Sequence, residues 1–429
     1  MENQSDMFDP LYLVTLDEIY HSRWAAKKRQ RIALLRKAFL YFWPKGHPSR
    51  LIHVTGTNGK GSVVHYIEQG LRFSGNIGSW TGPHVFDYAE RFHINAQQVS
   101  HADIVSIYRE MLLPYQERLN RMYPGESLTF AELGILLALH LFDRHGVTWG
   151  LMEVGAGGRY TPLMALDMEG CVLTNVGDDH PQTLGTEIWQ RALEKAGIAR
   201  YRVPFFTAAE EPALSYVQKT AIEQGAFPFI IVQPNDIEEM KTLKGDLPVF
   251  RLKNLALALK VIRFFYPAYD VNTFNISSDL PARFRRLTTN IIADVAHNPD
   301  KVFRLAEQLK HYYPGRKFRF LIGLSRSRNV RRVFAPLLEL AEHIVITGAS
   351  YAGQDPIQLA AELRQDFPHI EAIEEPSRAF EIEKQRIGKD GILVLTGSAY
   401  MIDQALNPNP FIRHLNATFG RRVLSSDIY

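Results

Sequence analysis

The sequence contains very little cysteine, no long apolar run and no strong excess of either charge. Its 429 residues include a single cysteine, Cys171, which excludes an internal disulfide and a zinc site built from several thiolates. Its most apolar stretch, around residues 133–142, is shorter than the ~18 residues of a membrane span. Residues 1–9 lack the basic start and apolar core of a secretory signal. We therefore expect a soluble cytoplasmic protein with no membrane partner.

The balance of charge gives no reason to expect a polyanionic partner such as duplex nucleic acid. Lysine and arginine number 49 against 46 aspartate and glutamate, for a net charge of +3. Hydrophobic residues make up 46% and charged residues 22%, which is ordinary globular usage and disfavours a disordered chain. The basic segment 23–36 has apolar residues at helical spacing, so it predicts a surface helix with a charged outer face.

Short runs of β-branched and apolar residues alternate with longer segments of helical periodicity along most of the chain. This alternation predicts parallel sheets covered by helices on both faces, and so an α/β fold. The pattern lapses over residues 264–275, where turn and breaker residues gather, and we place a domain boundary there. Residues 407–429 show no clear period and are either an extension or a contact with a partner. The expected strands are 51–55, 149–154, 171–175, 203–207 and 228–232 before the lapse, and 290–294, 318–323, 343–347, 371–373 and 391–396 after it.

The strongest local signal is a glycine-rich turn between an apolar strand and a helix. Gly56, Gly59 and Gly61 would let backbone N–H groups approach phosphate oxygens. Lys60 would neutralise the outer phosphates, and Ser62 would offer a hydroxyl to Mg²⁺ at the start of the helix. The spacing departs from the general Walker pattern, because Gly61 stands between Lys60 and Ser62. The turn predicts an ATP site made of Thr57, Asn58, Gly59, Lys60, Gly61 and Ser62.

A series of sequence blocks, in a fixed order, resembles one known family. The phosphate-loop segment is similar to that of the Mur ligase superfamily, and within it to the folylpolyglutamate synthase and dihydrofolate synthase family. The resemblance extends over about residues 46–400, nearly the whole chain. Its blocks are residues 46–48, 52–62, 81–84, 90–95, 129–132, 153–159, 174–180, 194–198, 281–284, 294–299 and 395–398.

The resemblance implies an α/β architecture of two domains. It implies a P-loop-type ATPase domain with a parallel sheet at residues 1–270, the Mur ligase central domain. It also implies a smaller Rossmann-like α/β domain at residues 271–429, the Mur ligase C-terminal domain. A protein of this architecture would bind ATP with one or two Mg²⁺ ions, and we expect a monomer.

The resemblance also implies roles for residues of the first domain. It implies that Glu153 and Ser62 hold the Mg²⁺ that bridges the ATP phosphates, although a glutamate after a strand can simply cap the next turn. It implies that His180 helps to bind a second metal ion, whereas a lone loop histidine is more often structural. By its residues alone, Lys195 would be an exposed helical lysine. In many family members the matching lysine is carbamylated, and both forms stay open here. The catalytic candidates are Lys60, His180 and Lys195, and the metal candidates are Ser62, Glu153, His180 and Lys195.

Four further residues are implied to contact ATP. Asn254, near the end of the first domain, would contact adenine, while Arg283, Asp294 and His297 would reach ATP across the cleft between the domains. On the residues alone, Arg283 stands in a run of arginines that could be an ordinary charged edge. Asp294 and His297 follow a predicted strand end, where open parallel sheets place ligand-contacting groups.

This ligand set fits an ATP-dependent ligation of a carboxylate to an amine. ATP would phosphorylate a substrate carboxylate, and an amino group would attack the resulting acyl phosphate to form an amide. The resemblance implies L-glutamate as the amine and dihydropteroate or a folate as the acceptor. Two alternatives stay open, namely a Mur-type ligase with a non-folate acceptor and a non-catalytic ATP-binding regulatory homologue.

Three segments depart from the family pattern. Gly82 stands where the family commonly has a serine that contributes to the metal site, so a side-chain oxygen is missing. Residues 160–164, Tyr-Thr-Pro-Leu-Met, replace a Leu-Asp-Ala-Thr-Asn segment near the acceptor site, which puts pterin recognition in question. Residues 323–329 carry arginines where the family often has Asp-Lys-Asp, so the local charge is inverted.

Overall fold

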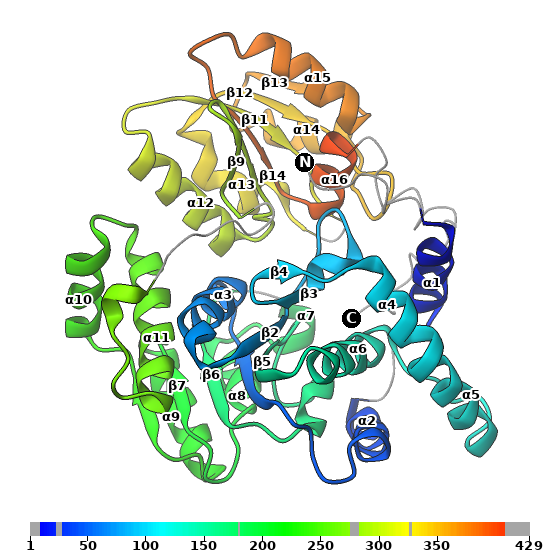
Figure 1. Cartoon of the computed structure of the whole chain (residues 1–429). Helices are drawn as coiled ribbons and strands as arrows, with labels where there is room; N and C mark the ends of the chain where they lie inside the picture. Colours follow the sequence, from blue (N-terminus) through cyan, green and yellow to red (C-terminus); the bar gives the residue numbers. More distant parts are fainter. Residues whose placement is uncertain (1–8, 23–27, 179–180, 275–282, 326–327, 408–429) are drawn as a thin grey trace. The chain divides into compact units, whose positions relative to one another are not determined.

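The chain divides into two compact units, each built around its own sheet (Figure 1). The domain boundary expected at residue 270 stays a prediction. The computed structural model describes residues 9–22, 28–178, 181–274, 283–325 and 328–407. Within these residues, the first unit comprises 9–83 and 88–274, and the second comprises 84–87 and 283–407.

The first unit contains an eight-stranded sheet with the strand order β4-β3-β2-β5-β1-β6-β7-β8. Six of these strands run parallel, namely β2, β5, β1, β6, β7 and β8. β3 and β4 pair antiparallel and form one edge of the sheet. Because β1 lies between β5 and β6, the loop after β1 is central at the carboxyl edge of the sheet. The strands are β1 Arg50–Thr55, β2 Asn76–Trp80, β3 Phe92–Ile94, β4 Gln97–Gln98, β5 Val147–Glu153, β6 Gly170–Leu173, β7 Phe205–Thr207 and β8 Phe229–Ile231.

Helices cover both faces of this sheet. Val172 of β6 lies in a buried cluster with residues of α3 and α11, whereas its neighbour Leu173 packs in another cluster with residues of α8 and α9. Burial on both faces is what continuous apolar runs in parallel strands predict. The helices are α1 Pro10–His21, α2 Lys28–Phe42, α3 Lys60–Leu71, α4 His101–Ile107, α5 Leu113–Met122, α6 Phe130–Arg144, α7 Pro181–Leu184, α8 Ile188–Ala196, α9 Ala213–Glu223, α10 Pro234–Lys244 and α11 Val249–Phe265.

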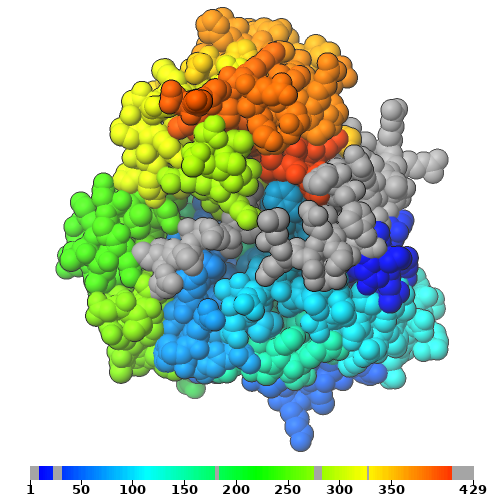
Figure 2. Space-filling view, turned by 45° about the horizontal axis from the view of Figure 1, so that its top comes forward, coloured from blue at the N-terminus to red at the C-terminus, as the bar shows by residue number. Residues whose placement is uncertain are grey.

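The longest helical run of the first unit joins three elements. α4 continues through a π-helical turn, η4 Tyr108–Leu112, directly into α5. This run lies in the cyan region of Figure 2. Among the described helices of both units, none combines the length and apolar content needed to cross a bilayer. Short 3-10 turns add η2 Arg72–Ser74, η3 Tyr88–Arg91, η5 Pro162–Ala165 and η6 Val271–Thr273.

The basic segment predicted as a surface helix contributes to α2, but one of its arginines is buried. Arg31 is 6% exposed. Its Nε donates to Oε1 of Glu132 on α6 at 2.8 Å, and Nη2 contacts Oε2 of the same carboxylate. Leu35 and Phe39 are buried too, while Lys37 is exposed. The inner face of α2 therefore fastens this helix to α6. The expectation of a charged outer face is only partly met among the described side chains, because Leu40 and Tyr41 are exposed beside Lys37.

All five strands expected in the first unit are present, and three others were missed. The missed strands, β2, β3 and β4, form one edge of the sheet. β2 reads Asn-Ile-Gly-Ser-Trp, whose polar and glycine residues mask a strand. Gly78 is needed there, because a Cβ would lie 2.4 Å from the Phe142 ring. α11 runs through Phe265, so the start of the expected domain connection is helical.

The second unit contains a six-stranded sheet with the strand order β13-β12-β11-β14-β10-β9. Its strands are parallel except for β9, which pairs antiparallel with β10. The five expected strands are present, and β9 was missed because its arginine-rich residues are mostly exposed. The elements are β9 Arg285–Thr288, β10 Ile291–Asp294, β11 Phe318–Ile322, β12 Ala341–Ile346, β13 Ile370–Ala372, β14 Leu393–Thr396, α12 Pro299–Tyr312, α13 Val330–Leu338, α14 Pro356–Leu363, α15 Pro376–Arg386 and α16 Ala399–Leu406.

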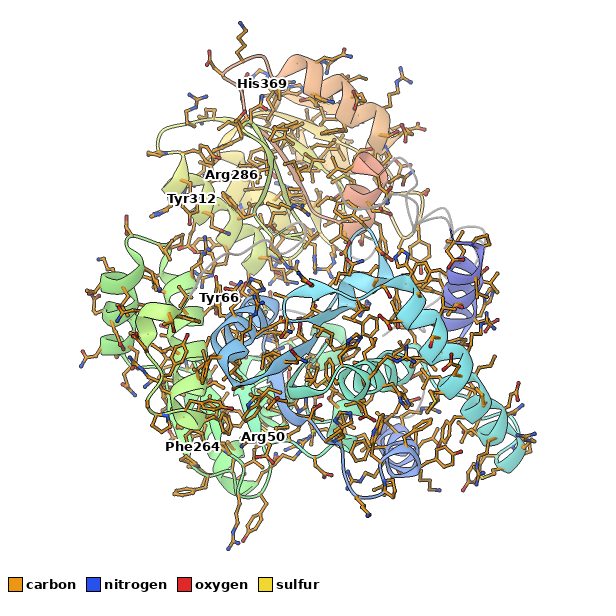
Figure 3. The ribbon with its side chains drawn as sticks, viewed as in Figure 1. Arg50, Tyr66, Phe264, Arg286, Tyr312 and His369 are labelled. Carbon is orange, nitrogen blue, oxygen red and sulfur yellow. The ribbon has the colours of Figure 1, made fainter. Side chains whose placement is uncertain are left out.

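Aromatic side chains fill the amino edge of the first sheet. Arg50 is the first residue of β1 and is labelled in Figure 3. Its guanidinium carbon lies 4.0 Å from the centroid of the Trp149 ring. The indole N–H of Trp149 donates to the Tyr266 hydroxyl at 3.0 Å. The glycine-rich loops lie at the opposite, carboxyl edge, where ligands of open parallel sheets bind.

Candidate active site

The loop after β1 turns the chain from the centre of the sheet into α3. Gly56 and Gly59 have φ angles of 147° and 77°, in the region that favours glycine. A Cβ on Gly56 would lie 1.9 Å from the hydroxyl oxygen of Thr174, so only glycine fits there. α3 begins at Lys60 without a side-chain cap, which leaves the N–H groups of its first turn available to a ligand. The segment therefore has the form of an anion-binding loop.

Residues that follow β6 hold this loop in place. The Thr174 hydroxyl donates to the carbonyl of Asn58 at 2.6 Å, and the Asn58 N–H donates to Oδ1 of Asn175 at 3.0 Å. The Thr57 N–H donates to the carbonyl of Asn175 at 3.1 Å, and the Thr57 hydroxyl oxygen accepts from the N–H of Gly177 at 2.8 Å. Sequence reasoning treated this block only as a source of a metal ligand and missed its positioning role. A Thr-Asn pair directly after a strand was the available signal.

Two lysine side chains converge on one carbonyl oxygen of the loop. Lys60 Nζ donates to the carbonyl of Gly56 at 3.1 Å and to that of Thr57 at 3.3 Å. Lys195 Nζ donates to the same Gly56 oxygen at 3.0 Å. Two ammonium groups that share an acceptor lie within about 6 Å of each other and repel, so an anion bound here would relieve the repulsion.

Lys195 is buried, contrary to the expectation from its residues alone. Its side chain is among the largest fully buried ones, and the residue is 2% exposed. α8 turns Arg191, Ala192, Lys195 and Ala196 inward together. This spacing of three and four residues is that of a buried helix face. Because two of the four residues are charged, the hydrophobicity pattern of the sequence does not indicate that this face is buried.

Glu153 and Ser62 offer oxygen ligands near the loop. Glu153 ends β5, is 5% exposed and lies opposite Val54 of the neighbouring β1. Ser62 is half-buried in the first turn of α3. A carboxylate and a hydroxyl are hard oxygen ligands, so these residues fit Mg²⁺. His180 lies outside the described residues. Among the described residues, no group of three or more His, Cys, Asp or Glu side chains could hold a metal ion.

Asn254 of α11 packs against the same loop. The residue is 6% exposed. A Cβ on Gly59 would lie 2.6 Å from its Nδ2 and 2.7 Å from its Oδ1, so the amide lies against the glycine backbone. The structure thus brings Asn254 to the turn where α3 begins, together with the half-buried Gly61.

In the second unit, the carboxyl end of β10 carries a buried carboxyl group. Asp294 accepts hydrogen bonds from the N–H of Phe284 at 2.7 Å and from the N–H of Ala296 at 2.8 Å. Burial raises the pKa of Asp294, and the nearby positive charge of Arg283 opposes this shift. Its two N–H donors fix the orientation of the carboxyl group at this sheet edge.

His297 follows in the same loop with both ring nitrogens engaged. Nδ1 lies 2.7 Å from the carbonyl oxygen of Val295, and Nε2 lies 3.1 Å from the ammonium of Lys301. These partners place the proton on Nδ1 and leave Nε2 as an acceptor. Arg328 Nη1 donates to the carbonyl of His297 at 2.8 Å, whereas residues 326–327 of the same segment lie outside the described residues. Contacts of Arg283, Asp294 and His297 with ATP stay predictions.

Comparison with known proteins identifies the family. Residues 54–188 match the Mur ligase middle domain, and residues 282–399 match the Mur ligase, glutamate ligase domain. The chain belongs to the Mur ligase family. The family resemblance drawn from the sequence blocks is thereby confirmed.

This Mur ligase family member is similar to curated proteins that are named folylpolyglutamate synthase and dihydrofolate synthase. A probable bifunctional folylpolyglutamate synthase/dihydropteroate synthase of Haloferax volcanii is 26% identical over 82% of this chain. The match spans only 45% of the Haloferax protein. A dihydrofolate synthase/folylpolyglutamate synthase of Bacillus subtilis is 24% identical over 83% of this chain and 90% of its own length.

Solved structures confirm the two-domain Mur ligase fold. Mycobacterium tuberculosis folylpolyglutamate synthase complexed with ADP has a TM-score of 0.81 and 22% identity, over 96% of this chain and 98% of the other. The bifunctional Yersinia pestis enzyme complexed with AMPPNP and Mn ion has a TM-score of 0.76 and 22% identity, over 97% of this chain and 100% of the other. At these identities the likeness concerns the fold.

In this Mur ligase, the segment that replaces Leu-Asp-Ala-Thr-Asn is a fixed apolar turn. Leu163 is 1% exposed, and its carbonyl accepts from Arg200 Nη2 at 3.2 Å. Arg200 Nη1 lies 2.9 Å from the sulfur of Met164, and Arg36 Nη1 donates to the carbonyl of Ala165 at 3.1 Å. Two arginines therefore hold the backbone of the turn, and residues 160–164 contribute no acidic or amide side chain.

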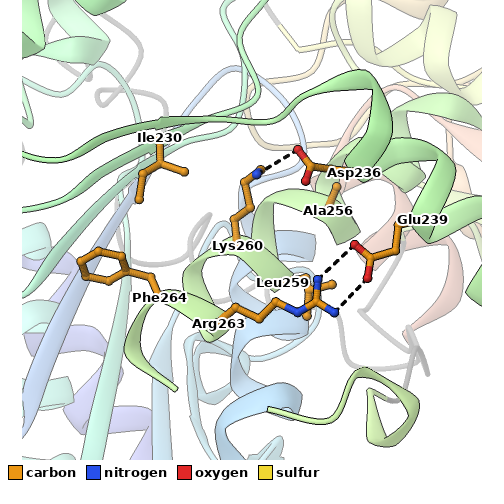
Figure 4. A pocket seen from close by; sticks show the side chains of 8 residues that line it. All are labelled: Ile230, Asp236, Glu239, Ala256, Leu259, Lys260, Arg263 and Phe264. Atoms are coloured by element: carbon orange, nitrogen blue, oxygen red, sulfur yellow. Dashed lines mark hydrogen bonds and ion pairs between the residues drawn. The ribbon is translucent and has the colours of Figure 1, made fainter. Parts of the chain in front are cut away.

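A hollow elsewhere in the first unit of this Mur ligase lacks the charge of a phosphate site. It has a volume of about 250 Å³ and lies beside β8, α10 and α11 (Figure 4). Lys260 pairs with Asp236 at 2.9 Å, and Arg263 pairs with Glu239 at 2.8 Å. These two cations are neutralised by their own neighbours, so they do not make the hollow a site for a phosphate group.

Proposed function

We propose that this chain is an ATP-dependent acid–amino-acid ligase that adds L-glutamate to a folate or dihydropteroate acceptor through an acyl phosphate. One observation carries the proposal. The open N-terminus of α3, with Lys60 in its first turn, adjoins a strand end that presents the buried carboxylate of Glu153. The names of the curated relatives support the choice of substrates.

The loop would bind the phosphates of ATP. The N–H groups around Gly59 and Gly61 would donate to phosphate oxygens, and the Lys60 ammonium would move from the loop carbonyls to the outer phosphates. Asn254 would contact the adenine, and Arg283, Asp294 and His297 of the second unit would complete the ATP site. Mg²⁺, held by Ser62 and Glu153, would supply charge neutralisation at the phosphates.

The reaction would proceed in two displacements. A carboxylate oxygen of the acceptor attacks the γ-phosphorus, and the bond to the leaving ADP oxygen breaks. The amino nitrogen of L-glutamate then attacks the acyl carbon, an amide bond forms, and inorganic phosphate leaves. The contribution of the chain is to position the reactants, to stabilise charge and to exclude water that would hydrolyse the acyl phosphate.

We also propose that Lys195 is carbamylated and then serves as a metal ligand together with His180. Carbamylation needs a neutral amine, and repulsion from the Lys60 ammonium at the shared Gly56 carbonyl favours that form. Intact-protein mass spectrometry under bicarbonate tests this, with Lys195→Arg as the control. We expect a mass increase by one carbamyl group that the control lacks. A wild-type protein whose mass equals that of its unmodified sequence contradicts the modification.

The enzyme assay measures phosphate release from Mg·ATP with L-glutamate and either dihydropteroate, tetrahydrofolate or no acceptor, with product masses read in parallel. We expect release that requires a pterin acceptor and a product heavier by one glutamyl unit. Nucleotide binding without pterin-dependent release would contradict the acceptor and favour either a different Mur-type acceptor or a regulatory role. For the working enzyme we propose a cytoplasmic monomer.

A further inference from the structure

The hollow beside β8, α10 and α11 is lined by charges of opposite sign on its two helices. Asp236 and Glu239 are three residues apart on α10, so their carboxylates share one face of that helix. Lys260 and Arg263 are likewise three residues apart on α11, and their cations meet these carboxylates (Figure 4). The lining therefore has no net charge, but its negative side is α10 and its positive side is α11.

The rest of the lining is apolar. Ala256 and Leu259 of α11 are each 2% exposed. Ile230 of β8 and Phe264 of α11 lie on one side of the hollow, and the two ion pairs lie on the other (Figure 4). The Phe264 ring packs edge-on against the Phe206 ring at a centroid distance of 5.4 Å. The hollow thus combines an apolar end with a dipolar one.

The ion pairs leave hydrogen-bonding capacity unused. Oδ2 of Asp236 accepts from the Gln233 N–H at 2.6 Å and pairs with Lys260 Nζ at 2.9 Å, whereas Oδ1 has no donor among the described residues. Within the same part of the chain, Lys260 pairs with Asp236 alone, and an ammonium has three N–H groups. Arg263 gives two of its five N–H groups to Glu239, at 3.0 and 2.8 Å. Acceptors on α10 and donors on α11 are therefore open to a ligand.

These features fit a small zwitterion. A phosphate or a dicarboxylate would bring net negative charge to a neutral lining, and a purely apolar ligand would bury the open donors and acceptors without partners. A free α-amino acid brings an ammonium for the carboxylates of α10 and a carboxylate for the cations of α11. The volume of about 250 Å³ lies below the roughly 300–1,000 Å³ of sites for drug-sized ligands, which fits a ligand of amino-acid size.

We propose that this hollow binds a free α-amino acid with an apolar side chain. The ammonium of the ligand donates to Asp236 and Glu239, its carboxylate accepts from Lys260 and Arg263, and its side chain packs against Phe264. L-glutamate fits poorly, because its second carboxylate would meet the apolar end. The site goes beyond the proposed function and does not rest on it.

Equilibrium dialysis of the purified full chain with radiolabelled L-leucine tests the proposal. We expect one bound L-leucine per chain, with a dissociation constant of ~1 mM or lower. Isocaproate lacks the ammonium and isoamylamine lacks the carboxylate. As competitors, each should bind at least ~10-fold more weakly than L-leucine, because one side of the dipolar end stays unpaired. A chain that binds no L-leucine overturns the proposal, and so does an analogue that competes as well as L-leucine.

Lys260→Met locates the site. Because the ligand carboxylate loses a charged donor, L-leucine should bind at least ~10-fold more weakly. The control is Lys253→Met on the same helix, where the lysine pairs with Glu210 outside the hollow, and it should keep the wild-type affinity. Lys60→Ala should keep it too, because the phosphate loop is a separate site. Unchanged affinity in Lys260→Met, or lost affinity in Lys60→Ala, overturns the assignment to this hollow.

Phe264→Ala tests the apolar end and keeps the proposal testable if Lys260→Met does not fold. Phe264 is 38% exposed, so its truncation should leave the first unit folded, which thermal melting checks. L-leucine should bind at least ~3-fold more weakly, because its side chain loses an apolar contact. L-alanine, with a single methyl group, should lose less. An unchanged L-leucine affinity in a folded Phe264→Ala protein overturns the packing of the side chain against this ring.

Discussion

At the scale of single residues, the central feature of the candidate site is a carbonyl oxygen that accepts hydrogen bonds from two lysine side chains. Lys60 and Lys195 both donate to the carbonyl of Gly56. The choice of Lys60 as a candidate phosphate-binding residue follows from the sequence, because a glycine-rich turn between a strand and a helix is a local signal. The burial of Lys195 does not, because its inward direction is decided by the packing of α8 on the sheet.

Replacement of Lys60 separates catalysis from stability. Lys60→Ala should lower the rate of phosphate release by ~100-fold or more, as loss of one stabilising donor at a transferring group does. Its free energy of unfolding should change by less than ~1 kcal/mol, because the half-buried side chain bonds only loop carbonyls. The matched control is Lys219→Ala on the exposed face of α9, with wild-type activity expected. A fully active Lys60→Ala protein contradicts the phosphate-loop assignment.

At the scale of elements, one buried ion pair fastens α2 to α6. Arg31 and Glu132 are 6% and 0% exposed, and Glu132 also accepts from the Thr129 N–H at 2.8 Å. Removing one partner leaves a buried charge without its counterion. Arg31→Met should therefore lower the free energy of unfolding by about 3–5 kcal/mol, measured by urea denaturation.

The exposed pair between Arg50 and Glu169 is the control for this prediction. Its side chains are 45% and 52% exposed. Glu169→Gln, which keeps the stacking of Arg50 on Trp149, should cost less than ~1 kcal/mol. Equal losses in Arg31→Met and Glu169→Gln would contradict the structural role of the buried pair.

The helix after the phosphate loop carries a buried carboxyl group that responds to pH. Glu68 is 2% exposed and accepts from the Ser79 hydroxyl at 3.0 Å and from the Ala96 N–H at 2.6 Å. Burial raises the pKa of Glu68 from 4.5 to about 7. Between these values the folded protein holds a proton that the unfolded chain has released. The free energy of unfolding attributable to this group therefore falls as the pH rises from 4.5 to about 7.

Glu68→Gln removes this titration and keeps a similar shape. The stability of the variant relative to the wild type should rise by a few kcal/mol between pH 4.5 and pH 7 and level off above. Urea denaturation at several pH values measures it, and comparison of the two proteins cancels the other titrating groups. A pH-independent difference between them would contradict the raised pKa of Glu68.

Elements with a strong internal pattern were predictable, and elements defined by their neighbours were not. The central strand β6 is a continuous apolar run and β1 is largely apolar, as expected of parallel strands that are covered on both faces. β2 contains Gly78 because the Phe142 ring occupies the space above it, and the same glycine weakens the strand signal. β9 is an exposed, arginine-rich edge strand that forms by pairing with β10.

At the scale of the whole molecule, ligand binding should stabilise the chain through the phosphate loop. AMPPNP with Mn²⁺ at 100 times its dissociation constant should add about 2.7 kcal/mol to the stability of the unit that binds it. The melting temperature should rise in the wild type and rise clearly less in Lys60→Ala at the same ligand concentration. Equal shifts in both proteins would show that the nucleotide binds elsewhere.

The two units carry different parts of the candidate chemistry. The first unit holds the phosphate loop and Glu153, and the second holds Asp294 and His297 at its own sheet edge. The family and the fold of both units follow from sequence blocks and alternating patterns. The identity of the acceptor does not follow from the sequence. Residues 160–164 lack the acidic and amide side chains of the family pattern, and arginines hold the backbone of the turn that they begin.

Oxygen transfer from the acceptor to phosphate tests the central claim most directly. The acceptor carboxylate is labelled with ¹⁸O, and the purified chain turns over with Mg·ATP and L-glutamate. Because the acyl phosphate bridges through a carboxylate oxygen, amide formation leaves that oxygen on the released phosphate. The account predicts one ¹⁸O atom per phosphate formed, read by mass spectrometry. Unlabelled phosphate released together with the amide product would contradict an acyl-phosphate ligase.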